Sequence, residues 1–345
     1  MTKQIKIGPV PVGGGAPVSV QSMCNTKTTD VEGSLAQIKA LYTAGCEIVR
    51  LTVPTLAAAE AFGRIAAQSP LPLVADIHFD YRCAIAAAEN GAAKIRINPG
   101  NIGGEERVKA VVDCCKAHHI PIRVGVNGGS LEKELLEKYG HPTPEALVES
   151  AFGHIRLLEK YGFYDTCVSM KSSSVPLMMA AYRLFSSQSD YPLHVGVTET
   201  GTEYMGTIKS AMGIGGLLCM GIGDTIRVSL TADPVKEVEA GYDILASIGL
   251  LPDRPTLVSC PTCGRTKIDL IALANEVEQR LRTVRKPITV AVMGCVVNGP
   301  GEAKEADIGI AGGDGCGLLF KKGEILRKVE EAQLLDALME EIAQL

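Results

Sequence analysis

The chain lacks any apolar run long enough to cross a membrane as a helix, which takes roughly 18 residues. Its longest candidate, around Ile214–Ile222, is short and interrupted by glycine. The first residues, MTKQIKIGPV, are polar and then turn-like, unlike a secretory signal peptide. We therefore expect neither a membrane protein nor an exported one, and place the chain in the cytoplasm.

An excess of positive charge is also missing. The formal net charge is −5 at pH 7, which argues against a nucleic-acid partner. The eleven cysteines are odd in number and scattered, so they do not suggest a disulfide framework, and a reducing compartment is expected. With 46% hydrophobic and 21% charged residues over 345 positions, the chain should be globular and divide into two domains.

Short apolar strands alternate with helix-length amphipathic segments from Val18 to about Ile248. The expected strands read VSVQSM, EIVRLTV, LPLVADIHF, AKIRINP, PIRVGVN, DTCVSMKSS, LHVGVTET and TIRVSLT. Eight β-α units are typical of a (β/α)8 TIM barrel, which we predict for residues 1–250. An open doubly wound sheet is the alternative, but eight regular units favour closure.

A smaller α+β unit is expected at residues 256–345, after a linker at Leu250–Arg254. We predict a helix over Asp269–Leu281, strands at ITVAVMGC and DIGIAGG, and a C-terminal helix from Ile325. In the barrel half, GIGG at Gly213–Gly216 fits no phosphate-binding fingerprint in the right context. We attribute its glycines to a tight turn.

Polar and charged residues lie near the carboxyl ends of the barrel strands, where barrel active sites form. They are Arg50, Asp76, His78, Arg96, Asn98, Arg123, Asn127, Lys171, Glu199, Arg227 and Ser229. The cations outnumber the two carboxylates, so internal pairing alone cannot neutralise this end of the barrel. The pattern favours a polyanion site, since arginine forks match phosphate oxygens. A ring of internal salt bridges is the alternative.

Three cysteines gather in the C-terminal part, Cys260 and Cys263 in SCPTCGRT and Cys295 in MGCVVNGPGEA. Thiolates in such loops hold iron–sulfur clusters or soft metals. Three thiolates leave one iron of a [4Fe–4S] cluster without a sulfur ligand, and Glu302 in the same loop could supply an exchangeable oxygen. The alternative is a structural zinc site with Cys316 as fourth ligand, which would leave Glu302 a solvated loop acid.

These cysteine motifs occur with VGGGAPVSVQSMCNTKTTD, EIVRLTVP, LVADIHFDYRCA, KIRINPGNIG, IRVGVNGGSL, VSMKSS and VGVTETG. In this order they resemble the 4-hydroxy-3-methylbut-2-en-1-yl diphosphate synthase family of the non-mevalonate isoprenoid pathway. The resemblance covers nearly the whole chain. No further domain separates the two units, so the chain is similar to the short bacterial form of the family.

The resemblance implies an iron–sulfur oxidoreductase that reductively opens the ring of 2-C-methyl-D-erythritol 2,4-cyclodiphosphate and removes a hydroxyl group as water. It implies that Cys260, Cys263, Cys295 and Glu302 hold a [4Fe–4S] cluster. Arg50, Arg96, Arg123 and Lys171 match diphosphate-binding residues, with Asn98, Asn127 and Ser229 as further candidates. Glu199 is a candidate acid near the leaving hydroxyl, and Asn298 a candidate substrate contact.

The resemblance also implies flavodoxin or ferredoxin as electron donor, and a head-to-tail homodimer in which the barrel of one subunit faces the cluster domain of the other. The short linker agrees with this, because roughly 17 Å of extended chain is less than a barrel width of about 30 Å. A barrel enzyme with a purely structural metal domain is the other class of function. A sulfite-reductase-like enzyme is a weaker rival, since no siroheme site is visible.

Overall fold

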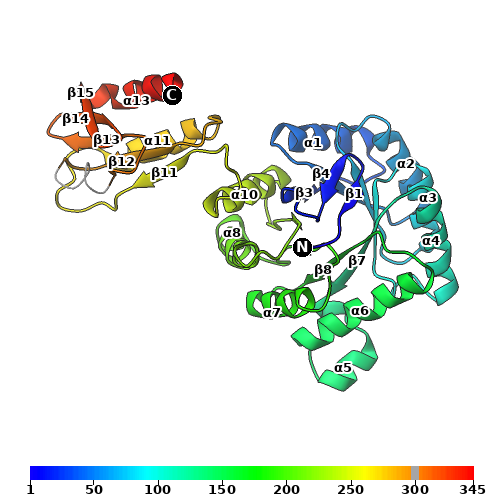
Figure 1. The fold of residues 1–345 in the computed structure, drawn as a ribbon. Coiled ribbons are helices and arrows are strands. Elements are labelled where there is room, and N and C mark those ends of the chain that lie inside the picture. The colour runs from blue at the N-terminus through cyan, green and yellow to red at the C-terminus, as the bar shows by residue number, and fades with distance from the viewer. Residues whose placement is uncertain (297–302) are drawn as a thin grey trace. The chain divides into compact units, whose positions relative to one another are not determined.

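The computed structural model describes residues 1–296 and 303–345, and it divides the chain into two compact units, Met1–Ile248 and Gly249–Leu345 (Figure 1). Within the described residues, no helix has both the length and the apolar character needed to span a bilayer.

Eight parallel strands form the main sheet of the first unit, in the spatial order β8-β7-β6-β5-β4-β3-β10-β9. They are β3 (Ser19–Met23), β4 (Ile48–Thr52), β5 (Leu73–Asp76), β6 (Lys94–Ile97), β7 (Ile122–Asn127), β8 (Thr166–Lys171), β9 (His194–Val195) and β10 (Thr225–Ile226). A parallel bridge between Val168 and Leu193 joins the two ends of the sheet. The predicted (β/α)8 barrel is confirmed, and all eight predicted strands are present.

Helices surround these strands (Figure 1). They are α1 (Val31–Thr43), α2 (Leu56–Ala66), α3 (Tyr81–Glu89), α4 (Glu105–Ala117), α5 (Lys133–Tyr139), α6 (Pro144–Lys160), α7 (Val175–Ser186), α8 (Glu203–Ser210), α9 (Gly216–Cys219) and α10 (Pro234–Ser247), with a 3-10 turn at Gly128–Ser130. Several begin at short polar caps: the side chains of Thr55, Thr143 and Ser174 each accept a backbone N–H of the first turn. These caps end the loops that follow β4, β7 and β8, at the mouth end of the barrel.

An N-terminal hairpin that the sequence analysis missed closes the other end of the barrel. Its strands, β1 (Ile5–Ile7) and β2 (Val10–Val12), pair antiparallel. Ile5, Ile7 and Val12 pack against Ile48 and Val74, near the amino ends of β4 and β5. The open mouth is therefore the carboxyl end of the sheet.

The interpretation of GIGG as a tight turn is wrong. Residues 203–219 form one continuous helical stretch, in which α8 leads through a π-helical segment (Ala211–Gly215) into α9. A Cβ on Gly213 would lie 2.6 Å from a methyl carbon of Val197 and 2.9 Å from the terminal methyl of Met178. Glycine is needed here for close packing against α7 and the segment after β9, not for a left-handed backbone.

Within residues 249–296 and 303–345, the second unit is a five-stranded mixed sheet with two helices. Its elements are β11 (Thr256–Ser259), α11 (Leu270–Leu281), β12 (Thr289–Met293), β13 (Ile308–Gly313), β14 (Cys316–Lys321), β15 (Glu324–Glu330), a 3-10 turn (Glu331–Gln333) and α13 (Leu334–Gln344). Strands β11, β12 and β13 run parallel, whereas β14 and β15 are antiparallel to their neighbours. Side chains from both helices share one apolar core with Val290, Val292 and Ile310.

The predicted C-terminal helix begins later than Ile325. Residues Glu324–Glu330 form β15, and the helix starts at Leu334. Lys322 and Gly323, which join β14 to β15, both have positive φ, 49° and 81°. Such a two-residue connection suits the twist of a tight hairpin, so the chain turns back as a strand before the helical apolar spacing of the last residues begins.

Candidate active site

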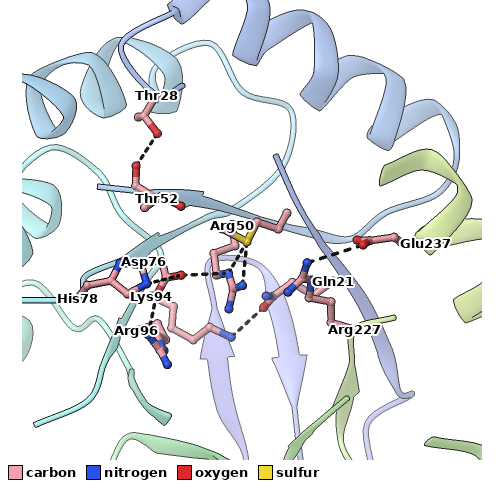
Figure 2. A network of polar contacts seen from close by, with 11 residues as sticks. Gln21, Thr28, Arg50, Thr52, Asp76, His78, Lys94, Arg96, Arg227 and Glu237 are labelled. Carbon is pink, nitrogen blue, oxygen red and sulfur yellow. Dashed lines mark hydrogen bonds and ion pairs between the residues drawn. The ribbon is translucent and has the colours of Figure 1, made fainter. Parts of the chain in front are cut away.

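Register places the charged residues of the barrel strands in two successive rows. One row runs from Arg50 through Val74 to Lys94, and the next row towards the mouth holds Asp76, Arg96 and Arg123. Arg50 is the partner of Met23. Arg96 is the partner of Asp76 on one side and of Arg123 on the other. Partners in parallel strands project to the same face of the sheet, so these side chains share one face. Figure 2 shows Arg50, Asp76 and Arg96 close together.

Asp76 is the carboxylate at the centre of this group. Its two oxygens lie 3.5 Å from Arg50 Nε and 3.1 Å from Arg96 Nη1, and His78 Nε2 lies at 3.9 Å. Burial would raise the pKa of the Asp76 carboxyl, but Arg50 and Arg96 outweigh it and lower the pKa to about 2. Asp76 is therefore an anion that fixes two arginines in place.

Among residues 1–296 and 303–345, Arg123 and Lys171 have no such carboxylate partner. Arg123 is 1% exposed, and its Nε and Nη1 have no hydrogen-bond partner among the described residues. Lys171 Nζ is likewise buried and unpaired within the described part of the chain. Burial, followed by the charges of Arg227 and Arg50, lowers the pKa of Lys171 well below its usual value. Buried donors without partners are costly, so these two residues point to an anionic ligand.

Arg227 has a partner that the sequence analysis did not identify. Its Nη2 lies 3.7 Å from Glu237 Oε1, on α10. Burial raises the pKa of Glu237, although Arg227 opposes this shift. Glu237 also accepts the backbone N–H of Leu230 at 2.9 Å, so it holds the segment after β10 as well. Glu237, not Glu199, is the second carboxylate of the cation cluster.

A cavity of about 580 Å³ opens after β7, β8 and β9, and Lys171 connects it to the cation cluster. Asn127, Lys171 and Glu199 contribute to its lining. Asn127 and Lys171 are register partners. Glu199 is exposed and has a φ of 54°, a left-handed conformation that is uncommon outside glycine and often marks functional positions.

Two predicted site residues, Asn98 and Ser229, stand apart from the cation cluster, and His78 lies at its edge. Asn98 is buried and turns its Oδ1 towards its own loop, where it accepts the N–H of Gly100 at 3.0 Å. The His78 ring is 44% exposed at the edge of the Asp76 group. Ser229 accepts a hydrogen bond from the hydroxyl of Thr200 through its backbone carbonyl, not through its side chain. Asn298 and Glu302 lie outside the described residues.

Sequence reasoning missed two buried residues of the barrel interior, Lys94 and His194. Lys94 is 0% exposed and donates to Gln21 Oε1 at 3.3 Å. Neither ring nitrogen of the buried His194 has a hydrogen-bond partner among the described residues. A signal was available for Lys94, because it precedes Arg96 by two positions in β6 and so shares its inward-facing side.

The cysteines of the second unit lie along one edge of its sheet. Cys260 directly follows β11, and Cys295 follows β12 by two residues. Cys316 begins β14 opposite Gly313, the last residue of β13. Because β11, β12 and β13 are parallel and β14 is antiparallel, all these positions fall at the carboxyl edge of the three parallel strands.

Hydrogen bonds connect the cysteine loops to each other. Gly294 N donates to Cys260 Sγ at 3.2 Å, and Cys263 N donates to Thr266 Oγ1 at 3.2 Å. A hydrogen bond from the backbone of Arg265 lowers the pKa of the exposed Cys263 thiol. Sulfur atoms that accept backbone N–H groups are typical surroundings of thiolate-held clusters. The donor set therefore fits such a cluster, although no group of three metal-binding side chains converges within residues 1–296 and 303–345.

Two family domains match the sequence. The GcpE TIM-barrel domain matches residues 2–242, and the GcpE protein C-terminal domain matches residues 256–344. A 4-hydroxy-3-methylbut-2-en-1-yl diphosphate synthase (flavodoxin) from Geobacter sulfurreducens is 60% identical over 99% of this chain and 97% of its own length. A protein of the same name from Caldanaerobacter subterraneus is 62% identical over 99% of this chain and 96% of its own length.

Solved structures support the barrel fold at much lower identity. Dihydropteroate synthase from Stenotrophomonas maltophilia matches with a TM-score of 0.52 and 13% identity, over 71% of this chain and 98% of that one. N-acetylneuraminic acid synthetase from Leptospira borgpetersenii matches with a TM-score of 0.52 and 12% identity, over 82% of this chain and 99% of that one. The two family domains and the full-length relatives together show that this chain belongs to the GcpE family, the 4-hydroxy-3-methylbut-2-en-1-yl diphosphate synthases.

Proposed function

We propose that this chain catalyses the reductive ring opening and dehydroxylation of 2-C-methyl-D-erythritol 2,4-cyclodiphosphate to (E)-4-hydroxy-3-methylbut-2-en-1-yl diphosphate. Within the geometry, the observation that carries this proposal is the excess of buried cations at the barrel mouth. Five cationic side chains, Arg50, Arg96, Arg123, Lys171 and Arg227, face two carboxylates, Asp76 and Glu237. A substrate with two phosphate groups would supply the missing negative charge.

In this proposal the barrel binds and orients the substrate. Arg50, Arg96, Arg123 and Lys171 hold the diphosphate, and Arg227 adds to the positive field. Asp76 keeps Arg50 and Arg96 in their binding positions. Glu199, which lines the adjoining cavity, carries a proton to the leaving hydroxyl group, which departs as water. Asn98, Asn127, His78, Ser229 and Asn298 remain candidates for further polar contacts.

The second unit is proposed to hold a [4Fe–4S] cluster through Cys260, Cys263, Cys295 and Glu302. Its support is the shared sheet edge of the three cysteines and their resemblance to the family motifs. Such a cluster carries electrons at low potential and would supply the two electrons that the ring opening consumes. Glu302 would be the exchangeable ligand, since a carboxylate is a harder ligand for iron than a thiolate.

The names of the curated relatives include flavodoxin, and we propose a flavodoxin as the electron donor, with a ferredoxin as the alternative. We place the reaction in the cytoplasm, a reducing compartment that suits eleven free thiols.

The activity is tested with anaerobically reconstituted protein, the cyclic diphosphate and reduced flavodoxin. The expected product is the linear diphosphate, identified by mass spectrometry, with one product formed per two electrons consumed. Cys263→Ser is the matched control and should form none. Binding of the cyclic diphosphate without any reduction by the reconstituted protein would contradict the proposed reaction.

A structural zinc site is the second candidate for the cysteine edge. Cys316 lies on this edge together with Cys260 and Cys295, so four thiolates are available in one region. Metal analysis of anaerobically purified protein separates the two assignments. A brown protein with iron and sulfide supports the cluster, whereas a colourless protein with one zinc per chain supports the structural site.

We also propose a head-to-tail homodimer, in which the cluster-bearing unit of one chain serves the barrel of the other. The support is the short predicted linker and the family resemblance. Mixing two inactive variants, Arg123→Ala and Cys263→Ser, tests it, because a mixed dimer would contain one site with an intact barrel and an intact cluster unit. Partial recovery of activity is expected after subunit exchange. Demonstrated exchange without any recovery would contradict shared sites.

A further inference from the structure

A lysine lies inside the barrel below the proposed diphosphate site, and no carboxylate of the described residues pairs with it. Lys94 is 0% exposed. Its Nζ donates a hydrogen bond to the amide oxygen of Gln21 at 3.3 Å. A buried lysine in a purely structural role is expected to pair with an acid. Lys94 does not, so its charge is not compensated by the protein around it.

The charged groups around Lys94 are mostly cationic. From the strands that enclose it, the titratable side chains are Arg50 (β4), Asp76 (β5), Arg96 (β6), Arg123 (β7), Cys167 and Lys171 (β8) and His194 (β9), beside the amide of Gln21 (β3). The barrel strands also carry the buried hydroxyl groups of Ser19, Thr166 and Thr225. Asp76 is the one acid of this group, and it is bound to Arg50 and Arg96. Figure 2 shows Lys94 next to Gln21, with Arg50, Arg96 and Asp76 close by.

Register fixes the level of Lys94. Its strand partner is Val74, which packs against the N-terminal hairpin, whereas Asp76 and Arg96 are partners one step nearer the mouth. Lys94 therefore lies in the row of Arg50, on the side of Asp76, Arg96 and Arg123 that faces the N-terminal hairpin. Burial, followed by the charges of Arg123 and Arg50, lowers the pKa of Lys94 from 10.5 to about 7. Burial therefore favours the neutral amine of this lysine in the empty barrel.

We propose that Lys94 is a positioning residue that takes up a proton from solvent when the cyclic diphosphate binds at the barrel mouth. The inference rests on the proposed function, since it requires that substrate at that site. The diphosphate would neutralise Arg50 and Arg123 and place negative charge above Lys94, which favours the ammonium form. The bound proton then adds one positive charge beneath the substrate. Without substrate, the neutral amine leaves no such charge buried in the barrel.

The coupling has a definite sign. Binding that takes up protons weakens as pH rises, because fewer protons are available to be bound. The native protein should therefore lose affinity for the cyclic diphosphate between pH 7 and pH 9. Below pH 7, where Lys94 carries its proton with or without substrate, Lys94→Met should bind on the order of tenfold more weakly than the native protein. This difference should shrink towards pH 9.

Calorimetry with the oxidised, cluster-loaded protein tests the proposal, and no turnover occurs because the electron donor is left out. Titration of the cyclic diphosphate at pH 8 in two buffers of different ionisation enthalpy gives the number of protons taken up. Lys94→Met should lose about half a proton or more per substrate bound relative to the native protein. Lys6→Met, at an exposed position on β1, is the matched control and should leave uptake unchanged. Lys171 accounts for any uptake that remains.

The outcomes separate the two proposals. If the native protein does not bind the cyclic diphosphate, the proposed function fails and this inference with it. If binding is normal and uptake in Lys94→Met equals native uptake, the role of Lys94 alone is overturned. Lys94→Gln serves if Lys94→Met does not fold. The native protein alone also tests the proposal. An affinity for the cyclic diphosphate that stays constant from pH 7 to pH 9 would contradict it.

Discussion

The barrel holds Arg50, Arg96, Arg123 and Lys171 on strands, whereas the second unit holds Cys260, Cys263 and Cys295 in loops. Arg123 is 1% exposed and sits in the middle of a hydrogen-bonded ladder. Cys263 is exposed and lies four residues beyond the end of β11. A strand fixes a side chain before any ligand arrives, which lowers the ordering cost of binding. A loop can adjust around a metal centre, and its thiols depend on that centre for their final arrangement.

The comparison predicts that the two chemistries can be separated by mutation. Cys260→Ser, Cys263→Ser and Cys295→Ser should each abolish reductive turnover and the brown colour, because a three-cysteine site cannot spare a thiolate. The barrel of each variant should still bind the cyclic diphosphate, as measured by calorimetry. Full iron and sulfide content in Cys295→Ser would remove this residue from the ligand set.

A second test asks whether Glu302 or Cys316 is the fourth ligand beside Cys260, Cys263 and Cys295. Glu302→Ala should reduce turnover severely, since it removes the proposed exchangeable ligand of the cluster. Cys316→Ala should leave the cluster and most of the activity. Steady-state rates and iron content of the two variants provide the measurement. The reverse pattern would favour the site made of four cysteines.

In the barrel, Asp76→Asn should affect stability most. It leaves Arg50 and Arg96 buried without their shared anion, which costs on the order of 3 kcal/mol of the free energy of unfolding. Urea unfolding followed by circular dichroism measures this change. Asp80→Asn, which alters a surface pair with Arg82 and keeps a residue able to cap α3, is the control and should change little.

The same variant has a pH signature. The folded pKa of Asp76 is about 2, below its usual 3.8, so its carboxylate stabilises the fold fully above about pH 5 and loses that effect as pH falls towards 2. The stability difference between native protein and Asp76→Asn should therefore be constant near neutral pH and shrink below pH 4. A difference that does not change down to pH 2 would mean that the ion pairs do not form.

The smallest of these effects is expected for single cations of the mouth. Arg96→Ala and Arg123→Ala should each weaken binding of the cyclic diphosphate by about one to two decades, the loss of one charge-assisted contact. Arg→Lys at either position should also weaken it, because the two-pronged guanidinium contact is lost. Calorimetry measures both. Unchanged affinity in Arg96→Ala and Arg123→Ala alike would contradict a polyanion site here.

Much of the barrel and part of its mouth could be predicted from the sequence. The β-α period gives the eight strands because a buried parallel strand must be apolar and a crossover helix must be amphipathic. Arg50, Arg96 and Arg123 are conspicuous for the same reason, since a charge inside an apolar strand is costly. The cysteine spacing and the family motifs pointed to the second unit in the same local way.

The tertiary structure decided which of these residues meet. Glu237, on α10, forms an ion pair with Arg227. The N-terminal hairpin Ile5–Val12 closes the end of the barrel opposite the mouth. Neither contact can be predicted from the sequence around the residues that make it. The common edge of Cys260, Cys295 and Cys316 depends on the pairing of β11 to β14. Local sequence sets which residues are apolar, charged or able to turn, but partners distant in the chain are selected by the packing of the whole fold. That is why the sequence determined the strands and the kinds of ligand, and only the structure placed Lys94 beneath the cations.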